Sequence, residues 1–311
     1  KSGMVVAQHL NAAEIGVEVM ERGGNAVDAA IAVAFALGPA EPQGSSIGGD
    51  GFVMVHMAQN ATVEVANGTG AAPLAATADK YPDGIPHDGI LGTSVPGILD
   101  ALLSAHDKYG TMSLAKCLEP AIELCEDGVP VSEFQSRIMA QHPVLRSSST
   151  SGPVFAPNGN WLKPGEIRRN PDLAGTYRQI IDHGRDAFYE GDIASAISRY
   201  STDNGGWITL SDLKDFRVGI ETPIEVNRQG TTLFTCGAWS QGISLAQMWS
   251  FLRHKNFKKI GHNSVEYIHT LTEIIKLVFA DREIYVGDPE FVKVPREKLL
   301  SNEYAESRLN L

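Results

Sequence analysis

The sequence feature that most constrains the fold is an apolar segment, Ala26 to Leu37, whose only charged residue is Asp28. Asn25 precedes this segment as a good helix N-cap, and Asp28 follows three residues later, where a negative charge favours a helix N-terminus. The pattern therefore predicts a helix that begins at Ala26. Because a helix that is apolar on every side is buried on every side, we expect it to lie between other layers of the fold.

A glycine-rich turn, Gly48 to Gly51, follows this helix. Residues 52–57 are typical of a β-strand, so the glycines predict a tight crossing from helix to strand. A phosphate-binding loop is disfavoured, because such a loop leads from a strand into a helix and ends in Gly-Lys-Ser/Thr. Gln59-Asn60 predicts a turn into a second strand at residues 62–65, and a second small-residue loop runs from Ala66 to Pro73.

The remaining elements follow from periodicity and turn residues. We expect helices near residues 11–22, 98–109, 113–126 and 265–286, a helix opened by Asn170, and strands at 224–227 and 231–235. Residues 141–170 are rich in Ser, Pro and Gly and lack apolar periodicity, so they predict a long surface excursion rather than a linker between domains.

The charge of the chain excludes some functions. Its formal net charge of -11 argues against a nucleic-acid partner, because phosphate binding needs clustered Lys and Arg. The one dense basic run, Arg253 to Lys259, is more typical of a solvated helix end than of a binding patch.

The cysteines and histidines do not indicate a metal centre. Cys117, Cys125 and Cys236 are expected to be buried thiols, since they form no CxxC pair, and the first two lie too far apart along one helix for a disulfide. His56 fits a strand, and His254 and His262 fit the surface. We therefore expect neither a metal nor a cofactor.

No membrane partner is expected, because no apolar run reaches the roughly 20 residues that span a bilayer. The sequence begins at Lys1 without a signal-peptide pattern, which favours a cytoplasmic location. A periplasmic or secreted location is the alternative, if a signal peptide was removed before Lys1.

The order and spacing of several motifs resemble the γ-glutamyltranspeptidase family. The motifs are the apolar helix, Glu41-Pro42, the Gly-Gly-x-Gly turn, Ala72-Pro73, Val95-Pro96-Gly97, Glu119-Pro120, Asp127-Gly128-Val129-Pro130, Phe279-Ala280-Asp281-Arg282 and Gly287-Asp288-Pro289. The resemblance covers nearly the whole chain. It implies an α/β (α+β) fold, the αββα four-layer sandwich of N-terminal nucleophile hydrolases, of which residues 1–311 form a single domain, the large-subunit part.

The resemblance also implies a partner chain. Members of this family are precursors that cut themselves into a large and a small subunit, and the new N-terminal Thr of the small subunit is the nucleophile, with its own α-amine as base. No catalytic residue is then expected in this chain, and the small subunit is its expected partner, with a dimer of heterodimers as a further assembly. Thr231-Thr232 is expected to be structural, because it lies within a predicted strand. If the chain is instead complete, it shows no recognisable catalytic triad.

One departure from the family pattern bears on specificity. The large subunit usually carries Arg-Glu-x-Ala-Pro, whose arginine grips the α-carboxylate of a γ-glutamyl substrate, and aligning the final Ala-Pro places Thr69 at the arginine and Gly70 at the glutamate. A threonine hydroxyl cannot replace a forked, charged clamp. Asn67, Thr69 and Gly70 are therefore candidate binding residues for another acyl group, although the segment is also consistent with a simple turn.

Trp239 and Gln241 are further candidates for substrate binding, because an aromatic wall and an amide at a helix start can orient a small polar molecule. A core position for Trp239 is equally consistent with the pattern. The expected function is hydrolysis of a small non-γ-glutamyl amide, as in oxamate amidohydrolase or acylase-like branches of the family. A true γ-glutamyltransferase or glutathione hydrolase, and an inactive scaffold of the same fold, remain alternatives.

Overall fold

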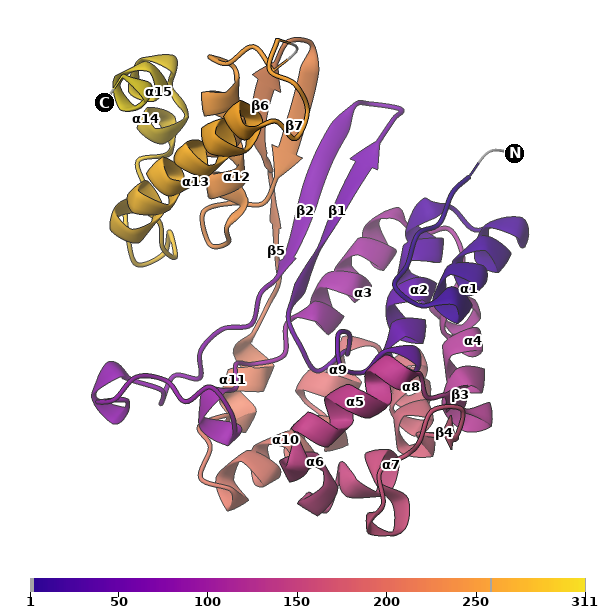
Figure 1. Cartoon of the computed structure of the whole chain (residues 1–311). Coiled ribbons are helices and arrows are strands. Elements are labelled where there is room, and N and C mark those ends of the chain that lie inside the picture. The colour runs from indigo at the N-terminus through magenta and orange to yellow at the C-terminus, as the bar shows by residue number, and fades with distance from the viewer. Residues whose placement is uncertain (1–2, 258, 311) are drawn as a thin grey trace. The chain divides into compact units, whose positions relative to one another are not determined.

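The computed structural model describes residues 3–257 and 259–310 (Figure 1). The described chain forms two compact units. The first unit comprises the residues up to Val53 together with Ala66–Gly219, and the second comprises Met54–Val65 together with the residues from Ile220 onward. The expectation of a single domain stays a prediction.

Helices dominate both units. The first unit contains α1 (Leu10–Glu21), α2 (Ala26–Ala40), α3 (Ile98–Tyr109), α4 (Leu114–Asp127), α5 (Glu133–Gln141), α6 (Pro143–Ser147), α7 (Gly152–Phe155), α8 (Pro171–His183), α9 (Arg185–Tyr189), α10 (Asp192–Asp203) and α11 (Leu210–Asp215), with the short 3-10 helices η1 (Ala78–Lys80), η2 (Ile90–Gly92) and η3 (Pro157–Gly159). The second unit contains α12 (Gly242–Leu252), α13 (Val265–Tyr285), α14 (Arg296–Leu300) and α15 (Asn302–Leu309).

The strands form three small sheets. Strands β1 (Gly51–Met57), β2 (Thr62–Gly68) and β5 (Gly219–Glu221) make a three-stranded sheet in the order β1-β2-β5. Strands β3 (Val129–Pro130) and β4 (Ile167–Arg168) pair antiparallel, as do β6 (Ile224–Arg228) and β7 (Thr231–Thr235). The helices and strands expected from the sequence are thus confirmed, and the predicted excursion at 141–170 contains α6, α7, η3 and β4.

Helix α2 begins as its sequence predicts. The Asn25 side chain accepts hydrogen bonds from the backbone N–H groups of Val27 and Asp28, and the Asp28 carboxylate accepts one from the Asn25 N–H at 2.8 Å. The expectation that α2 is buried on every side is wrong on one face, because Ala26 and Ala30 are exposed in this chain. The other elements of this chain therefore cover only part of the apolar surface of α2.

The C-terminal end of α2 is satisfied by side chains from distant positions. The Arg168 Nη2 group donates to the Pro39 carbonyl, and Gln135 Nε2 donates to the Ala40 carbonyl at 2.6 Å. Both donors are buried, and burial lowers the pKa of Arg168 to about 10. A positive charge at a helix C-terminus is favourable, so this contact offsets part of the cost of burying the guanidinium.

The second unit has its own core. Ile224 of β6 packs with Ile243 of α12 and Leu299 of α14, all almost fully buried. Beside them, the buried Asp281 of α13 accepts hydrogen bonds from Gln247 Nε2 at 2.6 Å and Tyr304 Oη at 2.8 Å. These contacts join α12, α13 and α15 through polar side chains.

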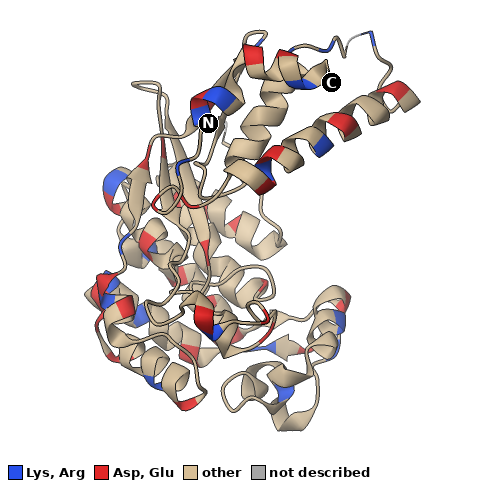
Figure 2. Cartoon of the chain, turned by 90° about the vertical axis from the view of Figure 1, so that its left-hand side faces the viewer, with Lys and Arg blue, Asp and Glu red and all other residues tan. Residues whose placement is uncertain are grey.

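The surface carries both signs of charge. Figure 2 shows acidic and basic residues interspersed along the helices rather than separated by sign. Within the described residues, none of the helices has the length and apolarity needed to cross a membrane.

Candidate functional site

The loop that follows β2 is the first candidate site, and hydrogen bonds within the first unit fix its backbone. The Thr69 N–H donates to Asn67 Oδ1 at 3.1 Å, and the Ala71 carbonyl accepts from the Val95 N–H at 2.9 Å. Asn67 is half-buried, and the Thr69 side chain is exposed. The structure therefore places Asn67, near the end of β2, beside Thr69 and Gly70 of the loop, and the Thr69 side chain is exposed to solvent.

Gly70 occupies a position that leaves no room for a side chain. A Cβ atom there would lie 2.1 Å from the Val95 carbonyl oxygen and 2.6 Å from Asp50 Oδ1. Because a Cβ atom cannot approach a backbone oxygen so closely, this backbone path requires glycine. The loop therefore cannot carry a glutamate at position 70 without moving.

Asp50 of the glycine-rich turn also holds this loop in place. Its Oδ1 atom accepts the Gly70 N–H at 2.9 Å and the Ser94 hydroxyl at 3.4 Å. The Gly70 N–H is thus already used within the protein, as is the Thr69 N–H. The role of Asn67, Thr69 and Gly70 in binding an acyl group stays a prediction. In the sequence, the position of Asp50 between Gly49 and Gly51 is the feature that could have marked it as a residue of the site.

The far end of the loop is also held by a carboxylate. Asp212, which is 8% exposed, accepts the Leu74 N–H at 2.9 Å and the Thr209 N–H at 2.8 Å. Burial alone would raise the pKa of Asp212, but the hydrogen bonds from Leu74 and Thr209 outweigh it and lower the pKa below its ordinary value. Asp50 and Asp212 therefore anchor the backbone on either side of Pro73.

A cavity of about 410 Å³ adjoins the glycine-rich turn. Its apolar wall comes from Ala34 and Leu37 of α2 and from Ile98 and Leu102 of α3. Its polar side chains are Gln43, Ser45, Ser46 and Asp50. The combination of an apolar wall and a few polar groups is typical of a small-molecule site.

Trp239 and Gln241 belong to the second unit. The Trp239 indole Nε1 donates to Glu221 Oε2 at 2.5 Å, and Gln241 Oε1 accepts from Arg282 Nη1 at 3.1 Å. Trp239 is half-buried and Gln241 is exposed at the start of α12. The two groups of candidates thus lie in different units, and the binding roles of all five residues stay predictions.

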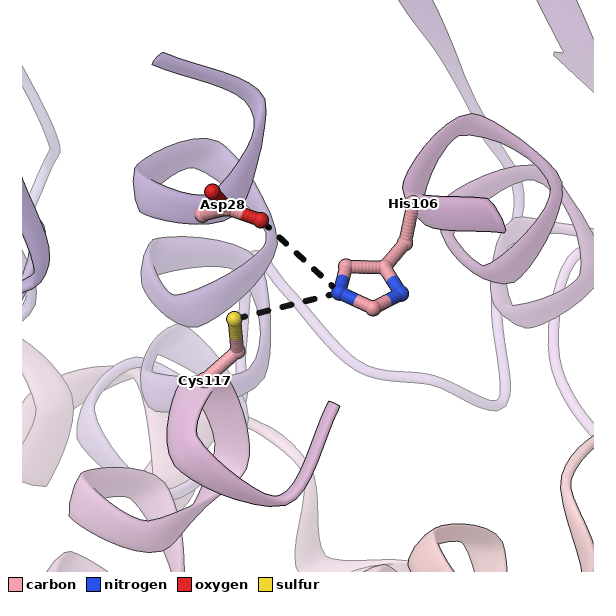
Figure 3. A group of neighbouring side chains, drawn as sticks. All are labelled: Asp28, His106 and Cys117. Carbon is pink, nitrogen blue, oxygen red and sulfur yellow. Dashed lines mark hydrogen bonds and ion pairs between the residues drawn. The ribbon is translucent and has the colours of Figure 1, made fainter. Parts of the chain in front are cut away.

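A cluster of metal-ligand type lies where α2, α3 and α4 meet. Figure 3 shows the Asp28 carboxylate and the Cys117 thiol facing the ring of His106. His106 Nε2 lies 3.8 Å from Asp28 Oδ1, 4.0 Å from Cys117 Sγ and 2.9 Å from the Met112 carbonyl oxygen. The short contact to a carbonyl requires a proton on Nε2, so this nitrogen is a donor and not a metal ligand.

The other two members of the cluster also fit poorly to a metal. The Asp28 carboxylate accepts from the backbone N–H groups of Asn25, Thr111 and Met112 and from the Thr111 hydroxyl at 2.6 Å. Burial raises the pKa of the Cys117 thiol to about 12, so it is not a thiolate near neutral pH. The cluster instead joins the N-terminus of α2 to the segment after α3.

Other sequence predictions can be checked directly. Thr231 and Thr232 lie in β7, and His56 lies in β1, as expected. Cys117, Cys125 and Cys236 are free and buried, as expected.

Known sequences resemble this chain along its length. The family model described as gamma-glutamyltranspeptidase matches residues 12–311. A glutathione hydrolase proenzyme from Bacillus subtilis (strain 168) is 38% identical over 100% of this chain and 54% of its own length. The Acylase ACY 1 proenzyme from Pseudomonas sp. (strain V22) is 33% identical over 98% of this chain and 57% of its own length. The chain thus spans about half the length of these curated relatives.

Solved structures also resemble this chain along its whole length. The Helicobacter pylori gamma-glutamyltranspeptidase has a TM-score of 0.96 at 32% identity, covering 100% of this chain and 91% of that one. A cephalosporin acylase from Bacillus halodurans has a TM-score of 0.90 at 30% identity, covering 100% of this chain and 61% of that one. The predicted fold class, the large-subunit part of the N-terminal nucleophile hydrolase fold, is therefore confirmed.

Proposed function

Because the chain belongs to the γ-glutamyltranspeptidase family, we propose that it is the large-subunit part of an amide hydrolase that matures by self-cleavage. The nucleophile is the N-terminal Thr of the partner subunit. The Thr hydroxyl attacks the amide carbonyl, and the Thr α-amine takes the hydroxyl proton. The α-amine then gives this proton to the substrate nitrogen, which leaves as a free amine while the acyl-enzyme ester forms. Water then attacks the acyl-enzyme ester and releases the acid. Relatives named as proenzymes support the self-cleavage.

The acyl group is small and is not γ-glutamyl. The observation that carries this proposal is the loop at Thr69 and Gly70. A Cβ at position 70 would lie 2.1 Å from the Val95 carbonyl oxygen, so the loop has no place for the family's glutamate at position 70 on this backbone. At the arginine position an exposed Thr69 offers one neutral hydroxyl. Losing a charge-assisted hydrogen bond costs about 1.5–3 kcal/mol, or about ten- to a hundredfold in affinity.

Asp50 adds an electrostatic argument. Its carboxylate receives the Gly70 N–H at 2.9 Å, directly beside the position where the family places its cation. A substrate carboxylate bound at this loop would meet a like charge without a compensating arginine. The arrangement therefore favours an acyl group that carries no carboxylate at this end. Two of the relatives are named as acylases.

The test compares three amides with the processed protein. The values of kcat/KM are measured for γ-glutamyl p-nitroanilide, for the neutral butyryl p-nitroanilide and for oxamate. We expect at least one of the non-γ-glutamyl amides to exceed the γ-glutamyl anilide about tenfold or more. Efficient γ-glutamyl transfer to a dipeptide would overturn the proposal.

Replacing Thr69 tests whether the loop lines the site. In Thr69→Arg we expect native turnover to fall and the relative kcat/KM for the γ-glutamyl anilide to rise about tenfold, because a forked clamp is restored. Thr69→Lys supplies the same charge without the fork and should give a smaller rise. Thermal stability should change little in both, since Thr69 is exposed. Unchanged kcat and KM in both variants would leave the loop as a turn.

Glutathione hydrolysis is the second candidate, favoured by the glutathione hydrolase proenzyme at 38% identity. It requires a carboxylate clamp from the partner subunit or from another part of this chain. A non-catalytic scaffold is the third candidate function. The N-terminal residue of the mature partner subunit distinguishes this scaffold from the two candidate enzymes, because a partner that begins with none of Thr, Ser and Cys has no nucleophile of this type.

A further inference from the structure

The second unit contains a cavity of about 700 Å³ with a basic lining. Arg228 comes from the end of β6, Arg253, His254 and Lys255 follow α12, and His262 and Tyr267 lie near the start of α13. The sequence predicted a solvated helix end for the run that begins at Arg253. This run does follow α12, and its residues 253–257 also line the cavity.

The charge of this lining is opposite to that of the chain. The whole chain has a formal net charge of -11, yet the lining contains Arg228, Arg253 and Lys255 and no carboxylate. Glu306 of α15 lies 3.9 Å from His254 Nδ1 but is not part of the lining. A concave surface with one sign of charge focuses its field and concentrates counter-ions.

The lining is held in place by neighbouring side chains. Arg253 Nη1 donates to Asn302 Oδ1 at 2.5 Å, and the Arg228 guanidinium lies 5.4 Å from the Trp249 ring centroid. The Tyr267 ring contacts His262 with centroids 5.4 Å apart. Because these groups are already ordered, binding an ion costs less conformational entropy than it would with free surface side chains.

Three buried nitrogens in this lining have no hydrogen-bond partner among the described residues. They are Nε of Arg228, Nε of Arg253 and Nε2 of His254. These nitrogens are shielded from the cavity, so an ion in it would be held by the positive charge of the lining. The same charge would repel a cationic molecule.

We propose that this cavity binds a small multivalent oxyanion, of the phosphate or tricarboxylate type. Its volume leaves room for such an ion together with water, and its three permanent charges favour a multivalent ion over acetate or chloride. The proposal does not depend on the acyl specificity proposed above.

The test is calorimetric titration of the processed protein with sodium phosphate and with sodium citrate, at constant ionic strength. We expect saturable binding of at least one of them and about tenfold weaker binding of acetate. Arg228→Gln should weaken the phosphate or citrate affinity about tenfold, and Lys255→Gln should act in the same direction. Turnover of the best amide substrate should be unchanged in both.

Lys276→Gln is the matched control, because it removes one positive charge from the exposed face of α13 in the same unit. It should leave the affinity within about twofold. Thermal melting without added anion establishes that each variant is folded. If Arg228→Gln does not fold, Lys255→Gln alone carries the test. Equal weakening in Lys276→Gln and the cavity variants, or no saturable binding of phosphate or citrate, would overturn the proposal.

Discussion

Carboxylates hold the candidate segments of the two units in different ways. In the first unit, the buried Asp28 and Asp212 and the exposed Asp50 accept backbone N–H groups, such as those of Thr111 and Met112 for Asp28, and the two buried ones also accept a threonine hydroxyl. In the second unit, Glu221 and Asp281 accept side-chain donors, namely the Trp239 indole for Glu221, and Gln247 and the Tyr304 hydroxyl for Asp281.

This difference determines how each candidate segment responds to mutation. Backbone N–H groups are present whatever the side chains are, so the shape of the loop at Thr69 depends on a few carboxylates and glycines. Removing one carboxylate leaves several donors without partners at once. In the second unit each contact joins two side chains, so replacing one donor removes one contact. The predictions below test that contrast.

The largest effect is expected for Asp28→Ala. It leaves the N–H groups of Asn25, Thr111 and Met112 without their acceptor, so the apparent free energy of unfolding in urea should fall by about 3–5 kcal/mol. Asp172→Ala is the matched control, because Asp172 is an exposed first-turn aspartate of α8. Its loss should cost below about 1 kcal/mol. Similar losses in both variants would contradict the importance of the backbone donors.

Gly70→Ala should follow. Its Cβ would clash with the Val95 carbonyl, and overpacking of this kind costs about 2–3 kcal/mol. Amide turnover should fall with it, if the loop lines the site. Gly175→Ala in α8 meets no atom within 4 Å and should instead raise the unfolding free energy by about 0.5–1 kcal/mol. Tolerance of alanine at Gly70 would show that the loop moves freely.

A smaller effect is expected for Trp239→Phe, which removes the indole N–H that donates to Glu221. Because Trp239 is only half-buried, we expect a loss of about 1–2 kcal/mol. Urea unfolding of Trp239→Phe, Glu221→Gln and the double variant gives the coupling energy. Strictly additive losses would mean that this hydrogen bond does not hold the segment.

The smallest effect is expected for the pH dependence of the stability that Asp212 contributes. Its pKa is lower in the folded protein than in the unfolded chain, so its stabilisation is present above the ordinary pKa of an aspartate and is lost as pH falls through the folded pKa. The difference in unfolding free energy between the wild type and Asp212→Asn should therefore shrink as the solution is acidified. A difference that stays constant with pH would contradict this role.

Local sequence signals explain what could be predicted. The spacing of Asn25 and Asp28 predicted the start of α2, and the periodicity of residues 98–109 predicted α3 with the bounds that the structure has. Each of these signals acts within a few residues, where helix capping and amphipathic spacing operate. The Thr69 departure was visible for the same reason, since it lies inside a short motif.

The contacts that shape the candidate sites join distant positions. Thr111 lies 83 residues from Asp28, and Gly70 lies 20 residues from Asp50. The basic cavity likewise needs Arg228 from β6 beside the run that begins at Arg253. Neither spacing nor composition encodes such pairings, because they depend on how the elements pack.

The contact between Arg168 and the C-terminal end of α2 also has a consequence for folding during synthesis. The Pro39 carbonyl is capped by Arg168, 129 residues further along the chain. At about 5–20 residues per second, a ribosome needs roughly 6–26 seconds to make that interval. During this time an apolar helix has emerged without the side chain that closes its end. Nascent chains arrested before residue 168 should therefore bind a chaperone more strongly than chains that include Arg168.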